Sequence, residues 1–339
     1  MNEIHKRGFS GQANMVKALG LLSGGLDSIL ACKILQEQGV NVTAISFVTP
    51  FFGTKNAEEA AKDLDIPLII TDITEKHLAM LLCPKHGYGK GMNPCIDCHA
   101  LMLNVAGKLM EEKGFDFIFT GEVLGERPMS QNKQSLHIVA KESGYADFIL
   151  RPLSAKLLPE TKPEKEGKVD RSRLLDLSGR QRKMQFEMAK KYDIKNIPTP
   201  ASGCLLTDPG FSARLRDLLK IKKCPAISDI ELLKAGRHIK LDEGRKIIVG
   251  RNKDDNSKLK SIENTDYVMF VPEGVPGPYC MVPKGIDEKL LDKAIKICAS
   301  YCSASEGDKI ILRPKDEKNK TFSAIFSKAN RPKEFIGGR

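Results

Sequence analysis

Short β-branched apolar runs alternate with stretches of helical periodicity over the first 150 residues. The apolar runs predict strands at 16–22, 41–48, 67–72, 115–120 and 147–150. The periodic stretches between them predict helices near 28–38, 56–64, 97–113 and 133–143. This alternation is typical of an α/β fold, in which crossover helices join the strands of a parallel sheet. Ligands of such sheets bind beyond the carboxyl ends of the strands, so we expect the loops after the first, second and fourth strands to share one crevice.

The pattern changes beyond residue 150. Residues 159–173 are charged and weakly periodic, which indicates a surface loop, and a helix is expected at about 178–192. Two short helices are expected within 211–235. From Gly236 onward, strand and turn signals surround one helix at 289–302, which predicts a small separate α+β domain.

The composition adds constraints on partners and chemistry. With 41% hydrophobic and 29% charged residues, the chain has the composition of an ordinary soluble protein. No apolar run approaches the roughly 20 residues of a spanning helix, and the polar stretch 1–14 lacks a signal-peptide core, so we expect a cytoplasmic location and no membrane partner. Its nine cysteines should then be reduced and available to metals or catalysis. A net charge of +11 indicates a polyanionic partner.

A turn rich in glycine and serine follows the first predicted strand. Its sequence is Ser-Gly-Gly-Leu-Asp-Ser at 23–28, and a helix begins within it. The glycines allow backbone N–H groups to approach an anion, while the helix N-terminus and the hydroxyls favour negative charge. A plain glycine turn is the alternative, but it leaves Asp27 without a role. We therefore predict an ATP site in which Asp27 helps to hold Mg²⁺. The residues expected to bind ATP are Leu22, Ser23, Gly24, Gly25, Asp27, Ser28, Ser46, Thr120 and Gly121.

Three cysteines form a second candidate centre. Cys95 and Cys98 are spaced as Cys-x-x-Cys at the start of a predicted helix, where the helix N-terminus favours thiolate. Cys204 follows a loop containing Pro and Gly and is the natural third partner. Three thiolates suit a 4Fe–4S cluster with one open iron. Zinc with His99 or Cys83 as a fourth ligand, covalent sulfur chemistry at Cys98 and Cys204, and unrelated buried thiols are the alternatives.

Four motifs carry a family resemblance. They are Leu-Ser-Gly-Gly-Leu-Asp-Ser at 22–28, Asn-Pro-Cys-Ile-Asp-Cys at 93–98, Phe-Thr-Gly-Glu at 119–122 and Ser-Gly-Cys at 202–204. Through them, residues 16–217 resemble the tRNA thiouridine synthases of the pyrophosphate-loop family. The resemblance implies a HUP-like (Rossmann-like) parallel five-stranded sheet with helices on both faces. It also implies catalytic roles for Asp27, Cys98 and Cys204. Cys95 stands where that family often has Asp, as in its cluster-dependent relatives, which favours metal ligation by Cys95, Cys98 and Cys204.

The C-terminal part carries a second resemblance. Its motifs are Ile-Ile-Val-Gly-Arg-Asn at 247–252, Asn-Ser-Lys-Leu at 256–259 and Val-Pro-Gly-Pro-Tyr at 275–279. With these, residues 236–339 resemble the RNA-binding domain of the ribosome-quality-control and fibronectin-binding-like family. The chain has no Trp, and Pro278-Tyr279 replaces the Ser-His of that family. The residues expected to follow an RNA backbone are Arg245, Lys246, Arg251, Lys253 and Lys258.

These features divide the chain into four segments. They are a flexible 1–14, an ATP-binding and thiolation domain at 15–217, a helical connector at 218–235 and an RNA-binding-like α+β domain at 236–339. The expected partners are tRNA and a sulfur donor, either sulfide or a persulfide-carrying protein, and a homodimer stays open. Arg127, Lys133 and Arg151 are further candidates for phosphate or RNA contact, and Glu122 for ribose or metal.

The predicted reaction is ATP-dependent tRNA thiolation that releases AMP and pyrophosphate. A uridine carbonyl is adenylated, and sulfur from the cluster or from a persulfide on Cys204 then displaces AMP. Two other classes stay open. One is another ATP-splitting synthetase on the same fold, which forms an amide or a nitrile and in the latter case contains zinc. The other is a non-catalytic RNA-binding protein.

Overall fold

The computed structural model describes residues 15–195, 197, 204–317 and 319–338. The predicted flexible segment 1–14 and the Ser202-Gly203 part of one motif lie outside the described residues. The chain forms two compact units. Met1–Gly87 and Pro94–Ser202 make the first, whereas Tyr88–Asn93 and Gly203–Arg339 make the second. Residues 203–235 are thus grouped with the C-terminal part, although the sequence suggested a boundary at 217 and a separate connector.

A five-stranded parallel sheet forms the centre of the first unit, as the sequence predicts. The strand order is β3-β2-β1-β4-β5, and every neighbouring pair is parallel. The strands are β1 (Lys17–Leu21), β2 (Asn41–Val48), β3 (Leu68–Asp72), β4 (Phe117–Thr120) and β5 (Ile149–Leu150). The chain order reverses between β1 and β4, so the crevice above these two strands is where an open α/β sheet binds its ligand.

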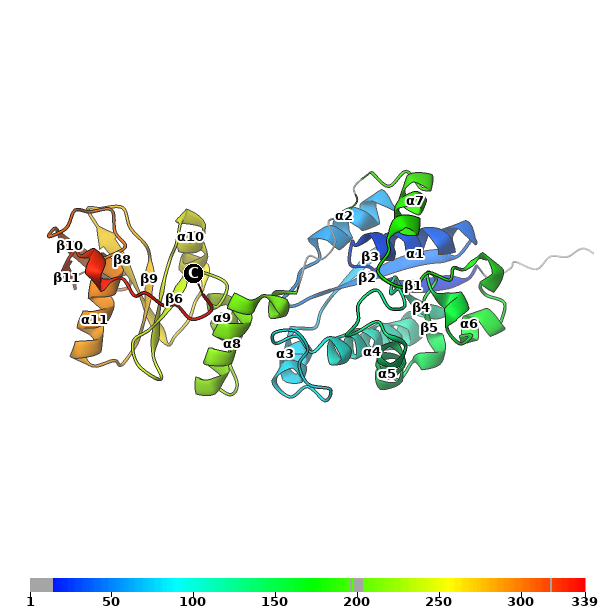
Figure 1. Ribbon diagram of the computed structural model, residues 1–339, viewed down its shortest axis with the longest axis horizontal. Helices are drawn as coiled ribbons and strands as arrows, with labels where there is room; N and C mark the ends of the chain where they lie inside the picture. Colours follow the sequence, from blue (N-terminus) through cyan, green and yellow to red (C-terminus); the bar gives the residue numbers. More distant parts are fainter. Residues whose placement is uncertain (1–14, 196, 198–203, 318, 339) are drawn as a thin grey trace, which may run out of the picture. The chain divides into compact units, whose positions relative to one another are not determined.

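Helices cover both faces of this sheet (Figure 1). They are α1 (Leu26–Glu37), α2 (Lys55–Asp63), α3 (Thr74–Leu82), α4 (Cys95–Lys113), α5 (Lys133–Ser143), α6 (Lys162–Lys165) and α7 (Lys183–Lys191). One apolar core joins α1, α2 and α7 to the sheet, and a second joins α4 and α5 to its other face. The sequence does not predict α3. His77 of that helix is fully buried between the rings of Phe51 and Phe52, so packing rather than periodicity stabilises it.

The second unit contains a six-stranded antiparallel sheet in the order β11-β10-β8-β9-β7-β6. The strands are β6 (Arg237–Lys240), β7 (Lys246–Val249), β8 (Tyr267–Glu273), β9 (Cys280–Pro283), β10 (Lys309–Pro314) and β11 (Phe322–Ile325). The helices are α8 (Pro209–Ile221), α9 (Ile227–Leu232), α10 (Lys253–Ser261) and α11 (Glu288–Ala299). The predicted α+β character is confirmed, whereas β6 and α10 are additions that the sequence pattern did not indicate.

Alternating residues of β7 show which helix covers which face of this sheet. Ile247 and Val249 belong to the apolar core that includes Ala294 and Cys298 of α11. Ile248 belongs to a different core, together with Leu259 of α10. Because successive side chains of a strand point to opposite faces, α10 and α11 cover opposite faces.

The short segment 88–93 is bound to residues 203–216 within the second unit. The N–H of Met92 donates to the carbonyl of Leu206 at 2.9 Å, and Arg216 donates to the carbonyl of Gly91 at 2.8 Å. A Cβ on Gly91 would lie 2.6 Å from the Ser212 hydroxyl. The chain therefore leaves the first unit and returns to it immediately before α4. None of the helices in the described part of the chain is long and apolar enough to cross a membrane.

Candidate active site

The loop between β1 and α1 has the geometry of an anion-binding turn. The side chain of Leu22 is buried, and its N–H donates to the carbonyl of Ile45 at 2.9 Å. Gly24 has a φ of +77°, and a Cβ there would lie 2.4 Å from the backbone of Asn56, so only glycine fits this position. The Ser28 hydroxyl donates to the carbonyl of Gly25 at 2.7 Å. The first backbone N–H groups of α1 have no helical acceptor and therefore favour an anion at this loop.

The loop after β4 lies directly against this turn. A Cβ on Gly121 would approach the backbone nitrogen of Ser28 to 2.4 Å. The two loops are therefore side by side at the carboxyl edge of the sheet, as the strand order predicts. Ser46 and Thr120 are both buried, and the Thr120 hydroxyl donates to a carboxylate oxygen of Glu122 at 3.0 Å. In this arrangement Thr120 orients the loop rather than exposing its hydroxyl.

Asp27, in the first turn of α1, faces a cation and a second carboxylate. One guanidinium nitrogen of Arg182 lies 3.7 Å from Asp27 Oδ2, and its Nε lies 3.7 Å from Glu126 Oε1. Both Asp27 Oδ1 and Arg182 Nε are buried without a hydrogen-bond partner, as is Oε1 of the fully buried Gln185. The sequence pattern does not indicate Arg182, Glu126 or Gln185, because nothing in their local sequence shows that they meet Asp27.

Burial controls the ionisation of this carboxylate pair. It raises the pKa of Asp27, an effect that Arg182 partly offsets. Burial and the charge of Asp27 both raise the pKa of Glu126. Two neighbouring carboxylates in a partly buried site repel each other, and a cation between them stabilises their charged forms. Because Arg182 carries only one positive charge, a second cation at Asp27 and Glu126 would be favourable.

The Cys-x-x-Cys pair lies at the start of α4. Cys98 is buried, and its Sγ lies 3.4 Å from Nε2 of His77. Cys95 is half-buried, and burial raises the pKa of its thiol, with Arg127 partly offsetting the effect. Desolvation of this thiol thus opposes the effect of the helix N-terminus, and a thiolate at Cys95 stays a prediction.

Cys204 belongs to the second unit and precedes a short turn at Leu205–Thr207. The Thr207 hydroxyl donates to the carbonyl of Cys204 at 2.7 Å. Within the described residues, no group of three or more His, Cys, Asp or Glu side chains is arranged to hold a metal ion. The ligand set Cys95, Cys98 and Cys204 thus stays a prediction.

A buried polar network connects α4 to the strand end beside the glycine loop. Glu122 accepts from Arg151 Nε at 2.9 Å and forms an ion pair with His99 Nδ1 at 3.0 Å. Burial opposes the charged form of Glu122, but Arg151 and then His99 outweigh it and hold the pKa at about 2. His99 follows Cys98 directly, so this network fixes the helix that carries the cysteines relative to Thr120.

The charge of Arg127 acts on ionisable groups of both candidate centres. Arg127 lowers the pKa of Asp27, Glu126 and Cys95, in each case partly offsetting burial. A single guanidinium therefore lies within electrostatic reach of the glycine-loop carboxylates and of the first cysteine.

The five basic residues predicted to contact RNA differ in their surroundings. Lys246 is buried and its ammonium lies 3.0 Å from Asp217, so it is not the solvent-facing lysine that the sequence suggested. Arg251 is exposed but forms a two-point ion pair with Asp255. The other three are exposed: Arg245, beside Asp242, and Lys253 and Lys258 on α10.

Two segments of the chain match known protein families. Residues 13–156 match the family described as thiamine biosynthesis protein (ThiI), and residues 236–336 match the NFACT protein RNA binding domain. The family resemblances that the sequence indicated are thereby confirmed for these segments.

Two solved structures are similar to parts of the chain. A protein described as a predicted subunit of tRNA methyltransferase from Methanocaldococcus jannaschii has 20% identity and a TM-score of 0.32, over 41% of this chain and 68% of its own. A 4-thiouridine synthetase in complex with RNA and bound ATP has 23% identity and a TM-score of 0.37, over 54% of this chain and 43% of its own. This chain therefore spans less than half the length of that synthetase.

Proposed function

We propose that this chain, which carries a ThiI-family domain at residues 13–156 and an NFACT RNA binding domain at residues 236–336, is an ATP-dependent tRNA sulfurtransferase. The ThiI domain supports tRNA thiolation at the level of the family, and the NFACT domain supports RNA as the partner. The observation that carries the proposal is the close approach of the Gly121 loop to the glycine loop at Ser28, together with the 3.0 Å contact of the neighbouring Glu122 with His99, which follows Cys98 directly. A site that activates a nucleoside and delivers sulfur needs carboxylate and thiol in one place.

ATP and Mg²⁺ fit the groups around the glycine loop. The loop offers first-turn N–H groups of α1 and the Ser23 and Ser28 hydroxyls for the phosphates. Asp27 Oδ1 and Arg182 Nε, both buried and without a hydrogen-bond partner, suit a divalent ion and a phosphate oxygen respectively. Asp27 and Glu126 would hold Mg²⁺, which would neutralise charge on the phosphates. Arg182 and Arg127 would then stabilise the pyrophosphate as it leaves.

The chemistry proceeds in two displacements. A uridine carbonyl oxygen attacks the α-phosphorus of ATP, and the bond to pyrophosphate breaks. Sulfur then forms a bond to the uridine ring carbon, and AMP leaves with the former carbonyl oxygen. A persulfide on Cys204, received from a persulfide-carrying donor protein, would supply this sulfur. The Cys98 thiol, beside His77, would then attack the Cys204 sulfur, so that the S–S bond to the transferred sulfur breaks and a Cys98–Cys204 disulfide is left for an external thiol to reduce.

An iron–sulfur cluster finds only partial support in the side chains. The first unit offers Cys95 and Cys98, and the described residues contain no three-membered ligand group. We therefore assign no reaction step to a cluster. Ligation of a cluster or of zinc by Cys95, Cys98 and Cys204 is a separate prediction that metal analysis tests.

The activity assay uses anaerobically purified protein with transcribed tRNA and Mg-ATP, in parallel reactions with sodium sulfide or with a persulfide-carrying donor protein and a thiol reductant. We expect thiouridine in the digested tRNA by mass spectrometry, with one AMP released for each thiouridine formed. The Asp27→Asn variant should lose AMP formation by about 10- to 100-fold, because a metal ligand is removed. Asp63→Asn, an exposed change on α2, is the matched control.

The sulfur step is tested separately. Cys98→Ser should abolish thiouridine formation while tRNA-dependent AMP release continues. Cys224→Ser, at an exposed cysteine, should leave both thiouridine formation and AMP release unchanged. Full thiolation by Cys98→Ser, or an absence of thiouridine with the unaltered protein, would contradict the proposal. Iron and acid-labile sulfide in the purified protein would support a cluster. Zinc alone would support the alternative metal, and metal-free protein that is active only with the persulfide-carrying donor would support persulfide chemistry.

A further inference from the structure

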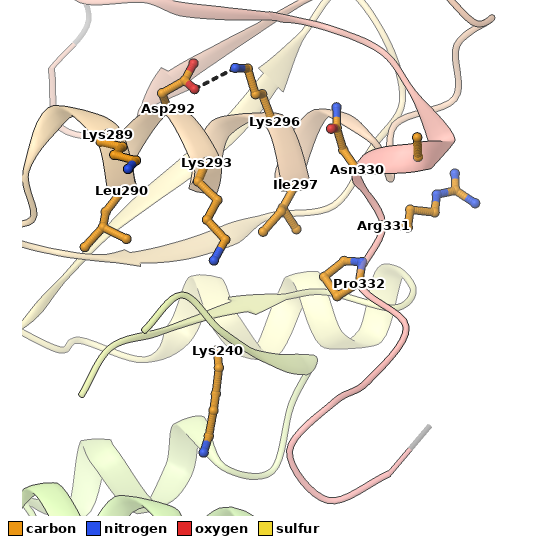
Figure 2. A pocket seen from close by; sticks show the side chains of 11 residues that line it. Lys240, Lys289, Leu290, Asp292, Lys293, Lys296, Ile297, Asn330, Arg331 and Pro332 are labelled. Carbon is orange, nitrogen blue, oxygen red and sulfur yellow. Dashed lines mark ion pairs between the residues drawn. The ribbon is translucent and has the colours of Figure 1, made fainter. Parts of the chain in front are cut away.

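A basic groove runs along α11 in the second unit (Figure 2). It has a volume of about 620 Å³ and lies between α11 and the segment 329–332. Among the described residues that line it, five are cationic and one is acidic. The cations are Lys240, Lys289, Lys293, Lys296 and Arg331, and the acid is Asp292. Leu290, Ile297 and Pro332 add apolar surface between the charges.

Of the five cations that line the groove, Lys240 lies 3.8 Å from Asp217 and Lys296 pairs with Asp292, whereas the other three form no ion pair with a described residue. The only acidic side chain that lines it, within the described part of the chain, forms an ion pair with Lys296 at 2.7 Å. Lys293 donates to the carbonyl of Leu241 at 2.7 Å, a contact that fixes its ammonium without neutralising it. Lys289 is exposed and forms no ion pair with any described residue. The groove therefore favours an anion along its length.

Arg331 is held in position at one end of the groove. Its Nε donates to the carbonyl of Ser300 at 2.7 Å, and its guanidinium lies 5.2 Å from the ring centre of Tyr301. Arg237 lies over the same ring at 5.0 Å. An arginine that is fixed by a neutral carbonyl and an aromatic ring keeps its charge and its remaining N–H groups for a ligand.

We propose that this groove binds the phosphodiester backbone of the RNA substrate, an inference that rests on the proposed function. Lys289, Lys293 and Lys296 are three or four residues apart, so they share one side of α11 and span about 10 Å along its axis. A nucleic-acid strand carries one charge about every 3.4 Å, so these three ammonium groups extend over several phosphates. Among the described residues, the apolar lining consists of aliphatic side chains and a proline, which suit ribose carbons, and it lacks the aromatic residues that are enriched in protein interfaces.

This groove is separate from the basic residues that the sequence indicated on α10. Lys253 and Lys258 lie on α10, and α10 and α11 cover opposite faces of the sheet. RNA contacts at the two helices can therefore be tested independently with paired substitutions.

The test measures tRNA binding by fluorescence anisotropy over a series of salt concentrations with the full chain. Lys289→Glu/Lys296→Glu should weaken binding by at least about 10-fold and reduce the slope of log affinity against log salt by about 1.4 to 1.8, since two phosphate contacts are lost. Lys309→Glu/Lys315→Glu changes the charge equally at exposed ends of β10 outside the groove. It should weaken binding less than about threefold, because screening limits distant charges.

Each outcome has a defined meaning. Equal effects of the groove pair and the β10 pair would overturn the groove assignment while leaving RNA binding intact. Absence of tRNA binding by the unaltered protein would instead overturn the proposed function, and the groove with it. Displacement of tRNA from the groove by an acidic peptide of matched charge at the same concentration would identify a protein-docking surface and also overturn the proposal. Lys289→Gln/Lys296→Gln, with a smaller charge change, should give the same slope with a weaker loss, and thermal melts confirm folding.

Discussion

At the scale of single residues, the glycine loop depends on backbone positions that no other residue can occupy. Gly24 combines a positive φ with a close approach to Asn56, and Gly121 presses against the backbone of Ser28. The sequence indicates an anion site through these glycines. It does not indicate Arg182 and Glu126, because their approach to Asp27 is created by the fold. A local motif therefore predicts the backbone part of the site but not the charged side chains that other segments supply.

Replacing Gly24 with Ala should destabilise the loop by more than the cost of a positive φ alone, because the new side chain would also clash. The added Cβ would lie 2.4 Å from the Asn56 backbone, so either the loop or the start of α2 must move. We expect a loss of about 2–4 kcal/mol in unfolding free energy and loss of ATP binding measured by calorimetry. Gly39→Ala is the control, since Gly39 has a φ of +79° but nothing within 4 Å of its Cβ position. Equal losses for both variants would contradict the steric explanation.

The stability of the first unit should depend on pH through the ionisation of Glu122. Its pKa is held at about 2, below that of the unfolded chain, so its contribution is present above about pH 4.3 and is lost as the pH falls toward 2. The contribution is about 3 kcal/mol. Glu122→Gln should therefore be less stable at pH 7, where Arg151 loses its buried partner, and should show a weaker fall in stability between pH 5 and pH 2.5 in urea titrations. Glu142→Gln, at an exposed pair with Lys85, should keep the original pH profile.

At the scale of elements, the order of strands and helices could be predicted where periodicity and apolar runs coincide. The parallel strands and α1, α2, α4 and α5 match the expected ranges within a few residues. The helix α3 was missed because its buried face includes His77, which a hydrophobic pattern counts as polar. The helix α10 was missed because its sequence, from Lys253 to Ser261, is almost wholly polar. Its cap explains why it forms, since the Asn252 side chain accepts from the N–H of Asp255 at 2.9 Å.

Lys246 on β7 allows a test of whether a basic residue stabilises the fold or contacts RNA. Lys246 is buried against Asp217, so Lys246→Ala should destabilise the second unit by about 3 kcal/mol, because this carboxylate loses its buried partner and keeps only the more distant, exposed Lys240. The salt dependence of tRNA binding should not change at a temperature where the variant is folded. Lys240→Ala is the comparison, because Lys240 is exposed and lies 3.8 Å from the same carboxylate, so its loss should cost less than about 1 kcal/mol. A reduced salt slope with unchanged stability for Lys246→Ala would reverse this assignment.

At the scale of the whole molecule, the sequence predicts two kinds of domain but misses where the chain divides. Charge and strand signals identify the C-terminal part, and the glycine loop identifies the first unit. The grouping of Tyr88–Asn93 with Gly203–Arg339 has no local signal, because it rests on pairings such as Met92 with Leu206, more than a hundred residues apart. For the same reason the sequence cannot show whether Cys204 joins Cys95 and Cys98.

Residues 88–93 belong to the second unit, so the chain passes between the two units three times rather than once. Truncation after Ser202 would deprive Met92 and Gly91 of their hydrogen-bond partners just ahead of the helix that begins at Cys95. A shortened protein made in this way would thus report on a disturbed cysteine helix as well as on a missing RNA module. Point substitutions on an intact chain are consequently the sounder means of separating catalysis from substrate capture.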